Sequence, residues 1–375
     1  MKTITILGQP SWRLKTDSVL AYVTRLGGMI APVTYRLKGG PVSPYSVVPW
    51  AEEKVPASVP ALVRAARGDF FCLPFGFNAR RYRGEAHPIH GECTHGPWRF
   101  EDLTRESGRV GLSLSFATRI RPGLITKEIM LVPGQTVIYQ RHTVSGMRGP
   151  MSYGHHAMLK FPSPEGSGRI AVSRFLFGQV WPGPHEDPAL GGYSSLRESA
   201  RFTSLRKVPL ANGGMTDLSL YPARAGYEDG VTLATDPSLS LGWTTVTFPR
   251  ERFLWFSLKN PKELGQTLFW FSNGGRHYAP WNGRHRNVMG LEEITSMVNG
   301  LPASVEANAF SRAGSPTHKA MDPRRPTSVR SIHGVASVPV GFDVVASLRP
   351  APGGIELRSK SGRVARAQVD LAYLG

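Results

Sequence analysis

The amino-acid sequence predicts an all-β protein, an antiparallel β-sandwich with few short helices. Apolar and polar residues alternate with a period of two in many short stretches, which is the pattern of strands buried on one face. Helical periodicity is scarce, and strands and helices do not alternate as they do in a parallel, doubly wound sheet. The 41 glycines and 31 prolines are spread over all 375 residues, as expected for many turns between short strands.

The strand candidates follow one another along the whole chain. In VGLSLSF (110–116), four apolar side chains fall on one face and Gly111, Ser113 and Ser115 on the other. Similar patterns mark TITIL (3–7), TVIYQRHTV (136–144), RIAVSRFLF (169–177), TTVTF (244–248), RFLWFSL (252–258), QTLFWFS (266–272), VASVPVGFDVVASLR (335–349) and GGIELRS (353–359). The best helix candidate is SVPALVRAARG (58–68), with Ser58 as its N-cap and Gly68 as its stop.

We expect the chain, residues 1–375, to form a single sandwich domain. Residues 1–70 would supply N-terminal strands and the short helix. Residues 311–328 are polar and rich in Pro and Gly, which predicts a surface loop. Residues 329–375 would then return to the same sandwich as terminal strands.

Cysteine content and hydropathy bear on the compartment. Cys72 and Cys93 are the two cysteines and give no disulfide framework, so a reduced compartment is the simpler expectation. The N-terminus lacks the apolar core of a signal peptide, and no run approaches the length of a membrane span. These features predict a soluble, cytoplasmic protein that does not bind a membrane.

The formal net charge of +18 comes from an arginine excess that is dispersed along the chain. Proteins that bind nucleic acid usually concentrate their charge on one face or in a tail, and no recognisable nucleic-acid motif is present. A nucleic-acid partner is therefore not expected. An anionic small substrate is favoured over it, because Arg binds phosphate and carboxylate groups bidentately.

Residues 71–100, FCLPFGFNARRYRGEAHPIHGECTHGPWRF, carry four arginines, three histidines, both cysteines and a tryptophan. His87, His90, Cys93 and His95 are potential zinc ligands, but their spacing, H-x2-H-x2-C-x-H, matches no common zinc signature. We therefore expect no metal site in this segment.

A sugar pocket would use the same segment differently. Sugar hydroxyls pair with His, Arg and Asn, and the CH face of a sugar stacks on Trp. Asn78, Arg80, Arg81, His90 and Trp98 supply these types and are predicted to bind substrate. For a single arginine, pairing with a loop carbonyl or a surface acid is the simpler explanation.

Several short motifs together resemble the aldose 1-epimerase (galactose mutarotase-like) superfamily, in a branch of uncharacterised epimerase-like proteins. They are GDFFCLPFG, HPIHGECTHGPW, GHHAML and MGLEEITS, in the family's order, and the resemblance spans roughly residues 44–348. The family implies an antiparallel super-sandwich and a reaction that needs no metal or other cofactor. A carboxylate removes the proton of the anomeric hydroxyl while a histidine protonates the ring oxygen, so that the ring opens and closes to the other anomer.

Matched residue by residue, the resemblance implies Glu292 as the general base and His156 as the general acid. The adjacent His155 is the alternative acid or a substrate contact, and His90 falls at a substrate-binding position. If the segment is extended, Glu293 points to the opposite side from Glu292. A helix that begins at the two glutamates is the other local possibility.

The segment before Glu292, SNGGRHYAPWNGRHRNVMGLEE, adds further binding candidates. Arg276 and Trp281 are predicted to contact the substrate, Trp281 as a stacking platform. If the substrate is anionic, Arg276, Arg284, Arg80 or Arg81 would hold it. GQVWPGPHED, around Trp181, is a second possible loop over the cleft.

The chain departs from the family pattern in three places. Asn78 and Arg80 are not adjacent, and Ile294 stands where the family places a glutamine after the catalytic Glu. The acid that holds the sugar hydroxyls has no motif here, although Asp217, Glu228 and Asp229 are candidates. These departures leave the sugar open and, to a lesser degree, the activity. The sequence does not indicate the oligomeric state. A non-catalytic carbohydrate-binding protein of the same fold is the alternative function, and a polyanion or nucleic-acid binder is a third.

Overall fold

The computed structural model describes residues 2–183 and 185–375, and in them the chain forms two large antiparallel sheets, one of 12 and one of nine strands. In spatial order the first sheet contains β1 (Ile4–Ile6), β2 (Gln9–Lys15), β3 (Val19–Thr24), β4 (Ile30–Leu37), β6 (Asp69–Cys72), β12 (Tyr153–Lys160), β23 (Val288–Thr295), β22 (Gln266–Ser272), β19 (Glu228–Thr235), β14 (Phe175–Val180) and β15 (Arg201–Phe202), with β5 (Gly40–Val42) paired to β4. The second contains β18 (Leu220–Tyr221), β13 (Gly168–Val172), β20 (Gly242–Phe248), β21 (Phe253–Lys259), β25 (Thr327–Ser337), β10 (Val137–Ser145), β9 (Gly123–Leu131), β8 (Arg109–Thr118) and β7 (Arg99–Glu106). The predicted all-β, antiparallel class is confirmed.

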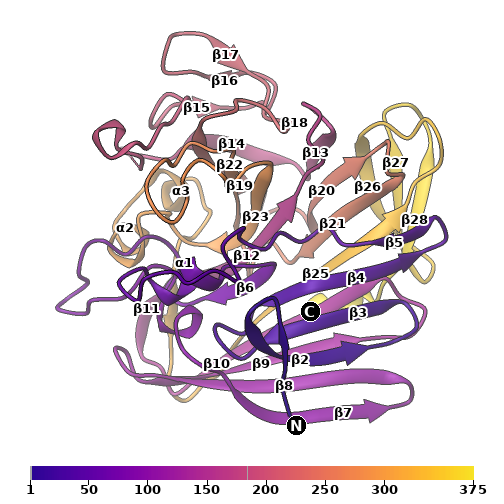
Figure 1. The fold of residues 1–375 in the computed structure, drawn as a ribbon, viewed down its shortest axis with the longest axis horizontal. Helices are drawn as coiled ribbons and strands as arrows, with labels where there is room; N and C mark the ends of the chain where they lie inside the picture. The colour runs from indigo at the N-terminus through magenta and orange to yellow at the C-terminus, as the bar shows by residue number, and fades with distance from the viewer. Residues whose placement is uncertain (1, 184) are drawn as a thin grey trace.

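Smaller elements complete the molecule. The small sheets pair β11 (Gly149–Met151) with β24 (Lys319–Met321), β16 (Val208–Pro209) with β17 (Met215–Thr216), and β26 (Val345–Ala351) with β27 (Gly354–Ser359) and β28 (Val364–Gln368). The α-helices are α1 (Ala61–Ala65), α2 (Leu301–Val305) and α3 (Ala309–Arg312), and 3₁₀ turns cover Glu92–Thr94, Pro188–Leu190 and Leu371–Leu374. In Figure 1 the α-helices gather on one side, near β6 and β12, and β26–β28 lie on the opposite side.

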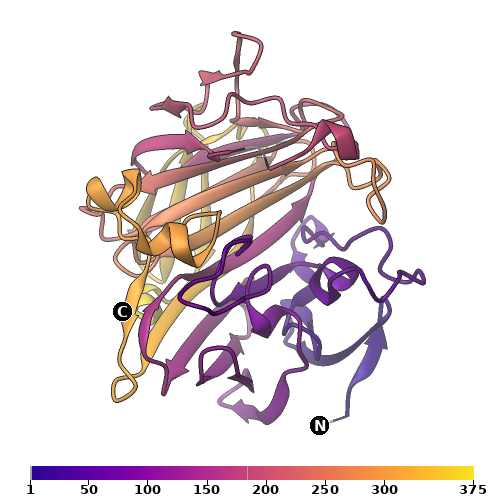
Figure 2. The same ribbon diagram turned by 90° about the vertical axis from the view of Figure 1, so that its left-hand side faces the viewer.

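The hydrophobic side chains form separate cores on the two faces of the first sheet. The largest core contains residues of both sheets, such as Leu14 from β2 and Leu114 from β8, and is the interior of the sandwich. A second core, rich in aromatic residues such as Phe70 and Trp270, lies on the outer face of the first sheet. Figure 2 shows this outer face, where short helices and loops lie over the strands. The central strands of the first sheet are therefore buried on both faces.

Several predicted boundaries are wrong because the alternation pattern does not reveal where a strand changes sheet. RIAVSRFLF forms two strands, β13 in the second sheet and β14 in the first. VASVPVGFDVVASLR is likewise divided between β25 and β26. The predicted loop at 311–328 contains β24 and the start of β25, and of the terminal strands only β25 joins a large sheet.

The predicted helix is shorter than expected. α1 begins at Ala61, and its N-cap is Pro60, which has φ −51° and ψ 140° and makes no side-chain cap. The assignment of Ser58 as N-cap is therefore wrong, because the non-helical ψ of Pro60 separates it from the helix.

None of the helices in the described part of the chain is long and apolar enough to span a membrane.

Candidate active site

Three neighbouring strands of the first sheet carry the centre of the site. In β12 and β6, His156 lies opposite Phe70 and His155 opposite Phe71, and β23 pairs with the other edge of β12. Because side chains alternate along a strand, His156 and Glu292 point to the outer face while His155 and Glu293 point into the sandwich. The outward position of Glu292 and the inward one of Glu293 agree with an extended segment at GLEE, so the helix alternative is wrong.

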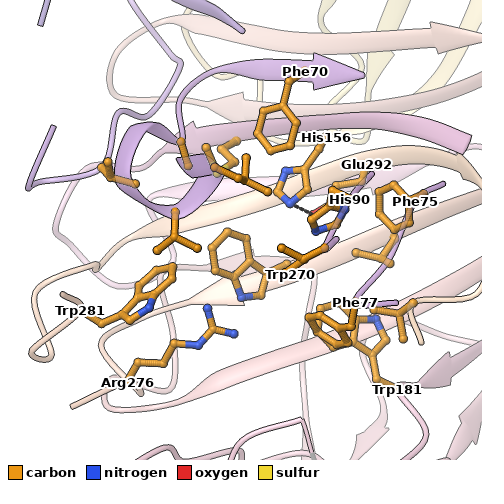
Figure 3. Close-up of a pocket in the computed structure, with 18 residues that line it drawn as sticks. Phe70, Phe75, Phe77, His90, His156, Trp181, Trp270, Arg276, Trp281 and Glu292 are labelled. Atoms are coloured by element: carbon orange, nitrogen blue, oxygen red, sulfur yellow. Dashed lines mark ion pairs between the residues drawn. The ribbon is translucent and has the colours of Figure 1, made fainter. Parts of the chain in front are cut away.

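His156 and Glu292 contact each other directly. His156 Nε2 lies 3.2 Å from Glu292 Oε1, and both side chains are buried. The His156 ring stacks on Phe70, with centroids 4.6 Å apart, and meets the edge of His90 at 5.0 Å. Figure 3 shows His156, Glu292 and His90 grouped together, with the contact between the pair drawn as a dashed line.

Burial controls the protonation of this pair. Desolvation raises the pKa of the Glu292 carboxyl well above its ordinary value. Desolvation also lowers the pKa of the His156 imidazole, to about 4. Both shifts favour the neutral forms, so at neutral pH the acidic proton lies on the Glu292 carboxyl group and His156 is neutral.

A tight His-Gly turn places His90 beside the pair. His90 has φ 57° and Gly91 has φ 81°, and a Cβ on Gly91 would lie 1.9 Å from the carbonyl oxygen of Leu73. Only glycine fits this close approach. The backbone N–H of Gly76 donates to His90 Nδ1 at 3.4 Å, which leaves the ring proton on Nε2. Burial lowers the pKa of His90, so the imidazole is neutral.

Arg276 and Trp281 lie away from the pair, on the other side of Trp270 (Figure 3). The Arg276 guanidinium lies over Trp281, 4.5 Å from its ring centroid, and over Trp270 at 5.5 Å. Its Nε donates to Glu186 Oε1 at 2.7 Å. The charge of Arg276 is therefore already compensated within the protein.

Glu228 is one of the three acids considered as candidates for holding the sugar hydroxyls. It lies behind the Trp270 side chain and does not line the cavity. It accepts hydrogen bonds from Trp270 Nε1 at 3.0 Å and from Ser272 Oγ at 2.9 Å. Burial raises the pKa of Glu228 to about 7, opposed by the positive charge of Arg276. Asp229 is held by Ser195 and Arg224 instead.

His156, Glu292, His90, Arg276 and Trp281 border a partly open cavity with a volume of about 100 Å³. Its lining residues are Val48, Leu62, Val63, Ala66, Phe70, Phe75, Phe77, Ile89, His90, His156, Met158, Trp181, Leu268, Trp270, Arg276, Trp281, Glu292 and Val298. The predicted residues that the fold brings together here are thus Glu292, His156, His90, Arg276 and Trp281. Trp181, from the second candidate loop, also joins them.

Two predicted substrate contacts are buried elsewhere and require correction. Trp98 belongs to the core inside the sandwich, where its Nε1 donates to the carbonyl oxygen of Cys93 at 2.8 Å. His155 faces the same interior and contacts Asp69 and Ser331. Neither residue lines the cavity. Trp98 packs inside the sandwich core, and the side chain of His155 lies on the opposite face of β12 from His156.

The other three predicted contacts hold loops in place. Asn78 Nδ2 donates to backbone carbonyls, and its Oδ1 accepts from the backbone N–H of Leu301 at 3.0 Å. Arg80 is exposed and pairs with Glu306 at 3.0 Å, and Arg81 is exposed and donates to the carbonyl oxygen of Gly84. None of the three lines the cavity, so the simpler explanation for a loop arginine applies to Arg80 and Arg81.

The four potential metal ligands of the same segment have separate partners. His87 contacts Glu85 at 2.8 Å, His95 contacts the carbonyl oxygen of Ile89, and Cys93 donates to that of Phe71. His90 faces the cavity instead. Across residues 2–183 and 185–375, no three His, Cys, Asp or Glu side chains are grouped so that they could hold a metal ion.

Four aromatic residues of the cavity lining are not among the residues that the sequence predicts for the site. Phe70, Phe75, Phe77 and Trp270 all line the cavity. Trp270 was inside a strand candidate, and alternation in QTLFWFS could have placed it on the face opposite Phe269 and Phe271. The sequence has no signal for which of the two faces borders a cavity.

Comparison with known proteins identifies the fold. No protein-family model matches the chain, and no curated protein matches it. Among solved structures, a galactose mutarotase related enzyme from Lactobacillus acidophilus matches with a TM-score of 0.57 at 10% identity, over 87% of this chain and 97% of that one. A galactose mutarotase-like protein from Clostridium acetobutylicum gives 0.58 at 12% identity, over 89% and 97%. The Slr1438 protein from Synechocystis sp. PCC 6803 gives 0.55 at 13% identity, over 90% and 100%. The chain therefore has the galactose mutarotase-like fold.

Proposed function

We propose that the protein is an aldose 1-epimerase-like isomerase, which interconverts the α and β anomers of a sugar or another cyclic hemiacetal. The observation that carries the proposal is the contact of His156 Nε2 with Glu292 Oε1 at 3.2 Å, at the wall of the cavity. These are the two residues that the motif resemblance assigns to acid–base catalysis. The names of two structures that share the fold, a galactose mutarotase related enzyme and a galactose mutarotase-like protein, point to the same chemistry.

The proposed reaction needs one base and one acid acting on neighbouring oxygens. Glu292 accepts the proton of the anomeric hydroxyl, and His156 donates a proton to the ring oxygen as the bond between C1 and that oxygen breaks. Ring opening gives an open-chain aldehyde as the intermediate. Rotation about the C1–C2 bond presents the other face of the carbonyl, and the reverse transfers close the ring and restore both side chains.

The electrostatics of the pair fit this cycle. Burial disfavours a charge on either partner, so over the neutral range Glu292 carries the acidic proton and His156 is neutral. Movement of that proton across the 3.2 Å contact supplies the ionised Glu292 and the protonated His156 that ring opening uses. His90 would donate a hydrogen bond from its Nε2 to a hydroxyl group of the substrate.

The test is anomer exchange measured by NMR saturation transfer on a panel of sugars and simple cyclic hemiacetals. Glu292→Gln keeps the shape of the side chain but cannot accept the proton, so exchange should fall by about 10²–10⁴-fold. Glu106→Gln, on the exposed strand β7, is the matched control and should exchange like the wild type. Wild-type exchange by Glu292→Gln would show that another group is the base. If the wild type binds members of the panel but exchanges none of them, the protein is a binding protein instead.

A further inference from the structure

The walls of the cavity are mostly apolar. Of its 18 lining residues, 14 are aliphatic or aromatic, and the others are His90, His156, Glu292 and Arg276. The Trp270 indole N–H is already donated to Glu228, so Trp270 offers the cavity only its ring. Most of the surface that a bound molecule meets therefore cannot form hydrogen bonds.

Apart from Arg276 and the unpaired indole N–H of Trp181, the polar groups of the lining are concentrated at one end. His90, His156 and Glu292 lie together there (Figure 3), where the hemiacetal must sit if the proposed reaction is correct. Arg276 is further along the wall, but its guanidinium is bound to Glu186 and covered by Trp281. A hydroxyl elsewhere in the cavity would face mostly rings and alkyl groups.

An ordinary hexose fits such a cavity poorly. Each hydroxyl that is buried without a partner weakens binding by roughly one to two orders of magnitude. Ring carbons without hydroxyls gain by leaving water for an apolar wall. The cavity volume of about 100 Å³ is also small, on the order of the ~150 Å³ cavities that take up one benzene ring.

The same contacts disfavour an anionic substrate. Glu186 lies 2.6 Å from the Arg276 guanidinium, and Glu228 is a second acid beside it. Arg284 and Arg80 are paired with Glu53 and Glu306 and lie outside the lining. An anionic group at Arg276 would have to approach carboxylates that already surround the arginine.

We infer that the substrate is a sparsely hydroxylated cyclic hemiacetal, a single six-membered lactol or deoxygenated sugar ring whose remaining ring positions are apolar. This inference rests on the proposed function and names its substrate class. The hemiacetal carbon lies at His156 and Glu292, and the apolar part of the ring packs against Phe70, Trp270 and the other ring and alkyl groups.

Two compounds with the same ring separate this class from ordinary sugars. 6-Methyltetrahydropyran-2-ol and 6-deoxyglucose share the ring, the methyl group and the anomeric hydroxyl, but only the sugar carries the other ring hydroxyls. Both have NMR-distinguishable anomers, so exchange can be measured for each and divided by its rate in buffer. Glucuronate provides the anionic comparison.

We expect the wild type to accelerate exchange of the lactol at least about 10²-fold more, in kcat/KM, than that of 6-deoxyglucose. Lactol exchange should disappear in Glu292→Gln and persist in Glu106→Gln, which locates the reaction at this site. Faster exchange of 6-deoxyglucose or of glucuronate would overturn the inference and leave the proposed isomerase function in place. No acceleration for any of the three compounds would overturn the proposed function, and the inference with it.

Discussion

Neighbouring residues in this site have opposite environments. Glu292 faces the cavity, whereas Glu293 is buried inside the sandwich, where its Oε2 lies 2.5 Å from Lys259 Nζ. Glu293 also accepts hydrogen bonds from Thr244 and Thr267, both at 2.7 Å. Glu292 can therefore contact a bound molecule, whereas Glu293 is part of a buried ion pair with Lys259.

This ion pair makes Glu293 a structural residue. We expect Glu293→Gln to lower the free energy of unfolding by about 3–5 kcal/mol, because the buried charge of Lys259 loses its counter-charge. Urea unfolding monitored by tryptophan fluorescence measures the loss. The double variant Lys259→Met with Glu293→Gln should be more stable than Glu293→Gln alone, since it leaves no unpaired charge. Wild-type stability in Glu293→Gln would contradict this account of the pair.

At the scale of a strand, β23 positions its carboxylate through a glycine two residues earlier. Gly290 and Glu292 point to the same face, and a Cβ on Gly290 would lie 2.3 Å from Glu292 Oε1. The atom it would meet is the mobile end of a side chain, so the backbone can stay in place while the carboxylate moves. The absence of a side chain at Gly290 keeps Glu292 within reach of His156.

Gly290→Ala should therefore affect the reaction more than the fold. The added methyl group pushes the carboxylate away from His156, and a displacement of about 1 Å at a reacting group can cost about 10²-fold in rate. We expect anomer exchange of the best substrate to fall by that order while the circular-dichroism spectrum stays unchanged. Gly39→Ala is the control, because a Cβ there meets nothing within 4 Å. Full activity in Gly290→Ala would mean that Glu292 does not need its observed position.

At the scale of the whole molecule, burying both faces of the first sheet also buries many ionisable groups. Desolvation lowers the pKa of five buried histidines: His156 and His333 to about 4, His285 to about 3, and His90 and His142 well below the ordinary value. Burial raises the pKa of Glu228 to about 7 and that of Glu292 well above the ordinary value. As the pH falls, the shifted histidines lower the free energy of unfolding and the shifted glutamates raise it.

The sign of the pH dependence follows from which state binds more protons. Between pH 6.5 and 4.5, the unfolded chain protonates the five histidines that the folded protein keeps neutral. Over the same range the folded protein retains protons on the two glutamates that the unfolded chain releases. Desolvation shifts the pKa of His95, His185 and Glu263 in the same directions, so seven histidines outweigh three glutamates. We therefore expect the free energy of unfolding to fall as the pH drops from 6.5 to 4.5, by up to about 1.4 kcal/mol per pH unit for each net proton.

Urea unfolding at the two pH values measures this fall. His285→Gln should reduce the dependence by about one proton, because the variant has one fewer buried imidazole that the unfolded chain can protonate. A protein equally stable at pH 6.5 and 4.5 would contradict the assignment of neutral, desolvated histidines.

The sequence alone is enough to predict the class of the fold and to single out two residues that meet at the cavity. Alternation and turn residues act between near neighbours, so strands such as β8, β20, β21 and β22 were recognisable without any tertiary information. The order of short motifs singled out His156 and Glu292, although their catalytic roles remain predictions. The alternation pattern is local, and each motif is a run of a few adjacent residues, so neither signal needs the tertiary structure.

Which side chains meet depends on the tertiary structure. His155 and His156 are adjacent and chemically identical, and what separates them is that one face of β12 covers the sandwich interior and the other borders the cavity. Trp98, Arg80 and Arg81 had the right chemistry for a sugar site, but packing and ion pairing placed them elsewhere. The contact of His156 with Glu292 and the apolar wall around it depend on the pairing of strands more than a hundred residues apart. That pairing is set by the burial of many side chains at once, which no short segment of the sequence records.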